Sequence, residues 1–317
     1  SALSMSKSEI QELRLNRESH WRFKLDLERI NWKDGILGDL SIDAASVSDP
    51  VLIRGDGQFL YTLASVCDDV DFGITNVVRG SDHVTNTATQ IQIIESLGGN
   101  VPDFSHHSLL TGSKGEPLSK RLGTLSLRDL RANGLEPMAI LSYMSRLGSS
   151  EAIELFDNID DLAENFDISN FGAQPTKFDL TDILPLSKKY ISGLDVSEVY
   201  DNLKASGVPS DIAPNFWLIV RENISTRAEI KHWWSICSEG VTPVIDKEDI
   251  KFIEIAKSLL PVGNFDENTW KNWTSEIKAI TGRKGKTLFM PLRKALTGME
   301  HGPDMSRLLP LLQKINI

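Results

Sequence analysis

A short loop in the first half of the chain combines glycines, serines and cations in a way that suits phosphate chemistry. Within the thirteen residues of 111–123, three are glycines, two are serines and three are lysine or arginine. Backbone amides and ammonium groups can follow negative charge as it develops on a leaving pyrophosphate, an interaction that contributes strongly in catalysis. The loop lacks the spacing of a P-loop, however, and its composition alone is more typical of a solvated surface segment.

A second group of polar residues surrounds one arginine. Arg79 follows the apolar segment 74–78 and precedes Gly80, an arrangement that directs a guanidinium into the crevice where open α/β sheets bind ligands. The planar fork of arginine matches a carboxylate in a bidentate way. The spacing equally allows a structural ion pair between Arg79 and Asp82, with His83 as a neighbour that caps a helix.

The adjacent histidines His106 and His107 are the candidates for metal binding. No Cys or Glu lies at ligand spacing from them. We therefore expect these histidines to be structural, and no metal site is predicted.

The far C-terminal part holds a local concentration of positive charge. Residues 281–298 include five cations and no acid. These cations are Arg283, Lys284, Lys286, Arg293 and Lys294. Lysine and arginine can neutralise phosphates, and the rings of Phe289, Trp270 and Trp273 offer faces on which unstacked bases could lie. Because helical tryptophans are usually buried, we expect Trp270 and Trp273 to belong to the core instead.

The apolar periodicity predicts the elements that must position these groups. The expected elements are a charged helix near 8–18, a strand at 21–25, a hairpin that pairs 51–54 with 58–61, a buried strand at 74–78, a helix from Asn86 to Leu97 and a helix from Pro137 to Leu147. A strand, a loop and a helix in succession are typical of an α/β sheet. From residue 148 onward the pattern is mostly helical.

The composition restricts the class of protein. The 317 residues carry 34 Lys and Arg against 44 Asp and Glu, a net charge of −10, and the length predicts two or three domains. No apolar run approaches the roughly 18 residues of a membrane span, and no signal peptide is recognisable. The chain has only two cysteines, and they are far apart in the sequence, so no disulfide framework is expected. We therefore expect the protein in a reducing compartment, the cytoplasm. The acidic balance argues against indiscriminate nucleic-acid binding but allows local basic patches.

Several segments, in order along nearly the whole chain, carry the motifs of a known family. They are 49–54, Tyr61, 74–83, 86–87, 104–106, 117–121, 281–298 and 301–303. In this order they closely resemble bacterial glutamyl-tRNA synthetase, a class I enzyme. The resemblance implies an α/β fold, the second half of a class I Rossmann-like catalytic domain, followed by an all-α C-terminal anticodon-binding region.

The resemblance also divides the chain into four expected parts. Residues 1–55 would be the remainder of an acceptor-binding insertion, and 56–125 the second half of the catalytic domain with its mobile Leu-Ser-Lys-Arg loop. Residues 126–194 would form a helical stem-contact region, and 195–317 the helical anticodon-binding domain.

The activity that the resemblance implies is ATP-dependent ligation of L-glutamate to the 3′ end of its tRNA through a glutamyl adenylate. ATP would be a substrate, and Mg²⁺ is expected with it. Lys120 would be the catalytic lysine of the mobile loop. The expected ATP-binding residues are Leu118, Ser119, Lys120 and Arg121, and the expected glutamate-binding residues are Tyr61, Ser65, Arg79, Asp82 and His83. Arg79 would bind the side-chain carboxylate and so separate glutamate from glutamine.

The implied macromolecular partner is a glutamate-accepting tRNA, and the sequence leaves open whether a glutamine-accepting tRNA is also charged. The expected tRNA-binding residues are Arg283, Lys284, Lys286 and Arg293. We expect a monomer and no membrane partner.

The chain departs from the family pattern at several positions. Pro117, Ser81 and Asn76 stand where the family usually has Lys, Glu and His. The family's opening Arg-Phe-Ala-Pro-Ser-Pro-Thr-Gly strand and its His-Ile-Gly-His-type signature occur nowhere in these residues, so we expect a truncated chain that is inactive alone. Two alternatives stay open, a non-catalytic tRNA-binding fragment and a glutamylating tRNA-modifying enzyme of the same superfamily. The length of the helical part after Asp195 counts against the second.

Overall fold

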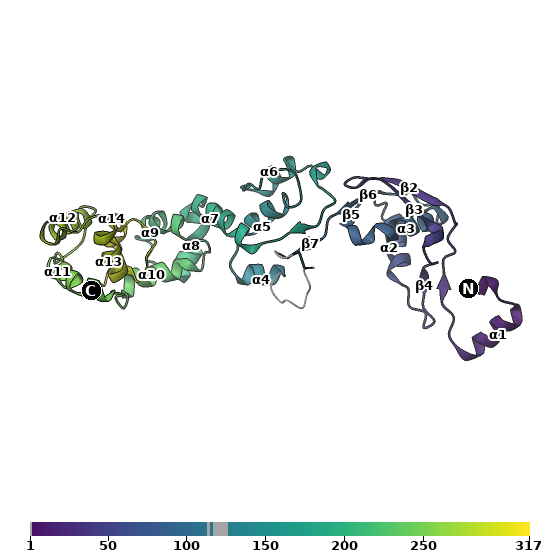
Figure 1. The fold of residues 1–317 in the computed structure, drawn as a ribbon, viewed down its shortest axis with the longest axis horizontal. Coiled ribbons are helices and arrows are strands. Elements are labelled where there is room, and N and C mark those ends of the chain that lie inside the picture. Colours follow the sequence, from purple (N-terminus) through teal and green to yellow (C-terminus); the bar gives the residue numbers. More distant parts are fainter. Residues whose placement is uncertain (1, 113–114, 117–125) are drawn as a thin grey trace. The chain divides into compact units, whose positions relative to one another are not determined.

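The structure is a computed structural model that describes residues 2–112, 115–116 and 126–317. The chain folds as two compact units (Figure 1). Unit 1 comprises Ser1–Leu118, Arg146–Ala152 and Asn165–Phe178, and unit 2 comprises Ser119–Ser145, Ile153–Glu164 and Asp179–Ile317. Among the residues that the structure describes, every helix is too short or too polar to span a bilayer.

Unit 1 begins with a helix and two antiparallel strand pairs. They are α1 (Lys7–Asn16), the pair of β1 (Trp21–Arg22) with β4 (Val51–Ile53), and the pair of β2 (Arg29–Asp34) with β3 (Gly38–Asp43). The turn between β2 and β3 closes because Gly38 adopts a φ of 76°. In the same turn Asp34 Oδ1 accepts the backbone N–H groups of Ile36 and Leu37, each at 3.0 Å. This turn leaves the second carboxylate oxygen of Asp34 available to another element.

The α/β part of unit 1 follows. Its elements are α2 (Tyr61–Asp71), β5 (Asn76–Gly80), α3 (Val84–Ser96) and β6 (Asp103–His107). β5 and β6 are parallel neighbours, and α3 is the crossover that connects them (Figure 1). Val66, Ile93 and Ile94 form the small buried core between α2 and α3. A second, short parallel pair joins β7 (Leu110–Thr111) to β8 (Thr176–Lys177).

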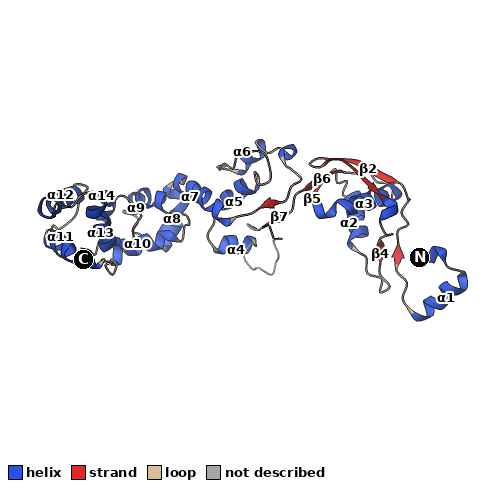
Figure 2. Ribbon diagram, viewed as in Figure 1, coloured by secondary structure: helices blue, strands red, loops and turns tan. Residues whose placement is uncertain are grey.

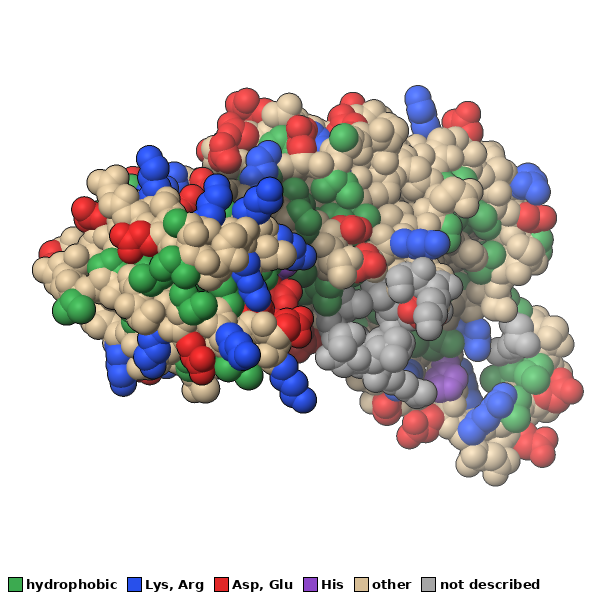
Figure 3. Space-filling view, turned by 60° about the vertical axis from the view of Figure 1, so that its left-hand side comes forward, with side chains coloured by type: hydrophobic (Ala, Val, Ile, Leu, Met, Phe, Trp, Pro, Cys, Tyr) green, Lys and Arg blue, Asp and Glu red, His purple; other side chains and the backbone are tan. Residues whose placement is uncertain are grey.

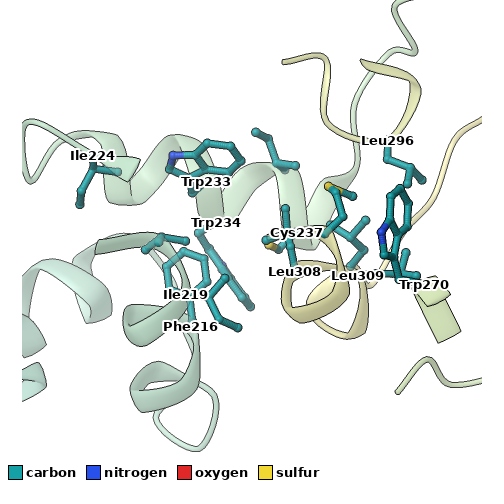
Figure 4. Close-up of a cluster of buried hydrophobic side chains, with 14 of the residues drawn as sticks. Phe216, Ile219, Ile224, Trp233, Trp234, Cys237, Trp270, Leu296, Leu308 and Leu309 are labelled. Carbon is teal, nitrogen blue, oxygen red and sulfur yellow. The ribbon is translucent and has the colours of Figure 1, made fainter. Parts of the chain in front are cut away.

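Unit 2 is helical, and the described strands all belong to unit 1 (Figure 2). Its helices are α4 (Leu127–Ala132), α5 (Pro137–Met144), α6 (Ile159–Glu164), α7 (Ile183–Gly193), α8 (Val196–Ala205), α9 (Ala213–Val220), α10 (Glu229–Glu239), α11 (Ile250–Ser258), α12 (Thr269–Thr281), α13 (Lys286–Thr297) and α14 (Met305–Leu308). A continuous core of buried aromatic and aliphatic side chains holds α7 to α14 together (Figure 4). Trp233, Trp234 and Trp270 all contribute to it. The helical interpretation of this half is confirmed.

Several local expectations are confirmed. The opening helix lies where the sequence predicts it, and Pro137 occupies the first turn of α5. Trp270 and Trp273 are 9% and 1% exposed, so both are core residues, as expected.

Other local predictions are wrong, each for a physical reason. The strand expected at 21–25 is only the two-residue β1. The expected hairpin is present, since Ile53 is bridged to Phe59 and the backbone N–H of Leu60 donates to Leu52 O at 2.8 Å. Its second arm is shorter than predicted, because the chain turns into α2 at Tyr61. Asn86 lies inside α3 rather than at its start. A 3-10 turn over Ser81–His83 leads directly into this helix, so no Asn cap is needed.

Candidate functional site

The candidate site lies at the carboxyl ends of the parallel strands β5 and β6. Arg79 and His106 are partners in the register, followed by Gly80 and His107. Open α/β sheets bind ligands at this edge. A Cβ atom at Gly80 would lie 2.5 Å from Asp82 Oδ1, so a larger residue here would require the Asp82 carboxylate to shift.

The half-buried Arg79 is held by two side chains. Its Nε donates to His106 Nε2 at 3.2 Å, and its Nη2 donates to Thr87 Oγ1 at 2.6 Å. Its guanidinium carbon also lies 5.3 Å from the centre of the Phe104 ring, within the range of a cation–π contact. Within the described part of the chain, Nη1 makes no hydrogen bond or ion pair. A guanidinium fixed on one edge and uncommitted on the other can receive a carboxylate.

His106 is held in turn by Asp34 from the β2–β3 hairpin. Both side chains are fully buried, and His106 Nδ1 lies 2.5 Å from Asp34 Oδ2. Asp34 Oδ1 also accepts the backbone N–H of His106 at 3.0 Å. Burial by itself raises the pKa of Asp34, but hydrogen bonds from His106 and from backbone N–H groups outweigh it and hold this pKa below its usual value. Asp34 is therefore a carboxylate at neutral pH.

Of the other predicted glutamate-binding residues, Asp82 and His83 directly follow this strand end and Tyr61 contacts His83, whereas Ser65 contacts α3. Tyr61 is 57% exposed, and its ring lies edge-on to His83 with 6.1 Å between centres. His83 Nε2 lies 3.8 Å from Asp82 Oδ2. Ser65 Oγ accepts a hydrogen bond from Gln90 at 3.1 Å. The alternative ion pair between Arg79 and Asp82 does not occur among the described contacts.

The sequence did not predict two of the residues in this hydrogen-bonding network. Thr87 stands out in the sequence only as part of a motif, and Asp34 does not stand out at all. Asp34 lies 72 residues before His106. Its local signal is the pair Asp34-Gly35, which indicates a turn but says nothing about a histidine.

The predicted ATP-binding residues Leu118, Ser119, Lys120 and Arg121 lie outside the described residues. Their roles stay predictions. In the described ranges, no group of three or more His, Cys, Asp or Glu side chains could hold a metal ion.

Three of the five C-terminal cations make contacts inside unit 2. Arg283 pairs with Asp249, and Lys294 Nζ lies 2.7 Å from an oxygen of Asp246. Arg293 donates to a backbone carbonyl at 2.9 Å, and burial lowers the pKa of this arginine. These three side chains are therefore committed to holding helices together.

Lys284 and Lys286 differ from them. Both are exposed, and neither makes an ion pair among the described residues. Phe289, one turn along α13 from Lys286, is 44% exposed and lies 6.2 Å from the ring of Trp270. Figure 3 shows acidic and basic side chains interspersed over the face that it draws.

Comparison with known proteins identifies related sequences and folds. Residues 1–185 match the family "tRNA synthetases class I (E and Q), catalytic domain", and residues 219–317 match "Anticodon binding domain". Glutamate–tRNA ligase 1 of Roseobacter denitrificans is 62% identical over 315 residues, which cover 99% of this chain and 71% of that protein. Glutamate–tRNA ligase 1 of Ruegeria pomeroyi is 59% identical with the same coverage.

Solved structures share the fold. The crystal structure of glutamate–tRNA synthetase from Elizabethkingia anophelis superposes with a TM-score of 0.76 at 23% identity, covering 98% of this chain and 69% of that one. That of a glutamate–tRNA ligase from Elizabethkingia meningosepticum, in complex with its amino acid, gives 0.78 at 22% identity with the same coverage.

Proposed function

The chain belongs to the class I tRNA synthetases of the E and Q group, and on that premise we propose that it acts in the ATP-dependent ligation of L-glutamate to tRNA. Its relatives at 62% and 59% identity are glutamate–tRNA ligases. Both the catalytic and the anticodon-binding families match. The anticodon match argues against the tRNA-modifying alternative, since enzymes of that kind lack the long helical domain.

The observation that carries the proposal for glutamate is the held guanidinium of Arg79. Two of its nitrogens are anchored by His106 and Thr87, while Nη1 is uncommitted at the strand edge. We assign to it the side-chain carboxylate of glutamate. Glutamine would present a neutral amide and leave the arginine charge uncompensated, so this contact also discriminates between the two amino acids. We assign Tyr61, Ser65, Asp82 and His83 to the same glutamate site.

The reaction then has two steps. A carboxylate oxygen of glutamate attacks the α-phosphorus of ATP, which forms glutamyl adenylate and releases pyrophosphate. A ribose hydroxyl at the tRNA 3′ end next attacks the glutamyl carbonyl, and AMP leaves. Lys120, with Leu118, Ser119 and Arg121, would stabilise charge on the leaving pyrophosphate. Mg²⁺ would enter with the ATP phosphates.

The remaining assignments extend this proposal. We propose the same four-part division of the chain. The acceptor-binding insertion ends at residue 55, and the second half of the catalytic domain spans 56–125. The stem-contact region spans 126–194, and the anticodon-binding domain spans 195–317. We propose a monomeric, cytoplasmic enzyme. Its tRNA is glutamate-accepting, and a glutamine-accepting tRNA is a second candidate substrate.

The proposed function is tested by charging tRNA with the natural protein, at whatever length it is made. With ATP, it should attach radiolabelled glutamate to glutamate-accepting tRNA and should leave labelled glutamine uncharged. The same assay with glutamine-accepting tRNA decides the second substrate. Failure to charge any tRNA with glutamate would contradict the proposal.

For the tRNA surface, we expect Lys284→Glu with Lys286→Glu to weaken tRNA binding. Both lysines are exposed and unpaired within the described chain, so their charge is available to phosphates. In filter-binding titrations at several salt concentrations, the slope of log K against log salt should fall by about 1 to 2.

The matched control is Lys204→Glu with Lys231→Glu, which changes the net charge equally at two exposed lysines on α8 and α10. This control should keep the parent slope. Equal slopes for the two double variants would contradict the assignment of Lys284 and Lys286. Arg283 is not suitable for this test, because its pair with Asp249 makes its loss a structural change.

A further inference from the structure

We infer that Asp34 and His106 are positioning residues for the glutamate site, with Asp34 setting the tautomer of His106 and His106 thereby fixing Arg79. The inference rests on the proposed role of Arg79. It adds two residues that touch neither glutamate nor ATP, one of them from the β2–β3 hairpin that precedes the α/β part of unit 1.

The tautomer follows from the hydrogen-bonding partners. A carboxylate can only accept, so the 2.5 Å contact between Asp34 Oδ2 and His106 Nδ1 places a proton on Nδ1. In the neutral ring, Nε2 then carries a lone pair. Arg79 Nε–H points at this lone pair at 3.2 Å, and Thr87 Oγ1 lies 3.0 Å from the same atom. An arginine can only donate, so it needs an acceptor at this position.

Asp34 is itself fixed, which makes its control over His106 specific. Its Oδ1 accepts three backbone N–H groups, from Ile36, Leu37 and His106. An asparagine at this position must keep its carbonyl oxygen toward those three donors, which turns its NH₂ group toward His106 Nδ1. Nδ1 would then have to accept, the proton would move to Nε2, and an N–H would face the N–H of Arg79. Asp34→Asn thus exchanges the tautomer while conserving shape.

The position of Arg79 depends on this arrangement. Two of its three nitrogens are engaged by His106 and Thr87, which leaves Nη1 at a defined place for the ligand. If Nε2 of His106 carried the proton, its N–H would face the Nε–H of Arg79 at about hydrogen-bond distance. Two donors would then repel each other where the parent has a hydrogen bond. Arg79 would retain its charge and lose its orientation, and the contact with a carboxylate depends on that orientation.

The test combines a spectroscopic and a kinetic readout in the natural protein. ¹⁵N NMR of histidine-labelled protein, with His106 assigned by its loss in His106→Gln, should show Nδ1 protonated in the parent and Nε2 protonated in Asp34→Asn. In glutamate-dependent ATP–pyrophosphate exchange, Asp34→Asn should raise KM for glutamate about tenfold, with a much smaller change in kcat. Asp39→Asn, at an exposed carboxylate of the same hairpin, should change neither quantity.

A second pair of variants keeps the test decisive should Asp34→Asn fold poorly. The carboxamide oxygen of His106→Gln can take the place of Nε2 as an acceptor, whereas His106→Leu provides none. We expect His106→Leu to raise KM for glutamate about tenfold and His106→Gln to restore most of the loss. Equal KM values for these two variants would overturn the inference.

The double-mutant cycle with Arg79 separates this inference from the proposed function. In an Arg79→Ala background, Asp34→Asn should have no further effect, because its effect acts through Arg79. An additive effect, an unswitched tautomer, or an unchanged KM in Asp34→Asn would each overturn the inference alone. If Arg79→Ala itself left KM for glutamate unchanged, the glutamate site would be wrong, and the inference would be overturned with it.

Discussion

Arg79→Ala is expected to raise KM for glutamate about a hundredfold and to remove most of the preference for glutamate over glutamine. The substitution deletes a charged, two-pronged donor, and each charge-assisted hydrogen bond contributes about 1.5–3 kcal/mol. Arg79 lies at the carboxyl end of β5 with Nη1 uncommitted. The measurement is ATP–pyrophosphate exchange in the natural protein, with each amino acid titrated separately.

Two control variants show whether the effect of Arg79→Ala comes from the loss of its guanidinium group. Arg79→Lys keeps the charge but loses the fork, so it should retain part of the affinity and less of the selectivity. Arg14→Ala removes an exposed arginine from α1 and should leave KM unchanged. Equal discrimination between glutamate and glutamine by Arg79→Ala and the parent would contradict the pocket assignment.

The sequence predicts well those elements whose signals are local. The strand that contains Arg79, the crossover helix after it and the helix from Pro137 all follow from apolar periodicity and from Gly and Pro positions within one short window. The class I fold and the membership of the family are likewise confirmed. The hairpin pairing of 51–54 with 58–60 is also confirmed, but its second arm ends one residue early because α2 begins at Tyr61, and a local pattern does not decide where that helix starts.

The contacts within the candidate site, in contrast, could not be predicted from local signals. Arg79 could be identified from its place after an apolar segment, although the prediction that this strand is buried is wrong: no residue of β5 is buried, and Val78 is 58% exposed. The side chains that hold Arg79 could not be identified. Asp34 meets His106 across 72 residues because the β2–β3 turn packs its carboxylate against β6. The sequence indicates that a turn exists at Asp34-Gly35 and not which strand that turn meets. Buried polar networks depend on tertiary contacts, so single-sequence reasoning assigned His106 a structural role without its partner.

The charge of the C-terminal cations likewise depends on tertiary contacts. Five cations without an acid between them look like one patch in the sequence. In the folded unit, acids 34 and 48 residues earlier in the chain neutralise two of them, as Asp249 does for Arg283 and Asp246 does for Lys294. The free charge is therefore smaller than the run of residues suggests, and it lies at Lys284 and Lys286.

Lys120→Ala is expected to slow adenylate formation about a hundredfold while leaving glutamate binding nearly unchanged. Removing one well-placed cation from a phosphate group that gains charge in the transition state costs on the order of 3 kcal/mol. The residue's place in a Leu-Ser-Lys-Arg loop that resembles the family's mobile loop carries this expectation. Single-turnover adenylate formation in the natural protein at saturating ATP gives the rate, and equilibrium dialysis gives the affinity for glutamate.

The pattern of effects decides between a catalytic lysine and a surface loop. Lys7→Ala, which removes an exposed lysine from α1, should alter neither the rate nor the affinity. If Lys120→Ala formed the adenylate at the rate of the parent, the assignment of this loop to catalysis would be wrong. The loop would then be a solvated surface segment, as its composition alone favours. Because Arg79 is proposed to bind the side chain of glutamate and Lys120 the leaving pyrophosphate, the first variant should act on affinity and the second on rate. Two variants that lowered both quantities alike would indicate a general disturbance of the fold and would contradict both assignments.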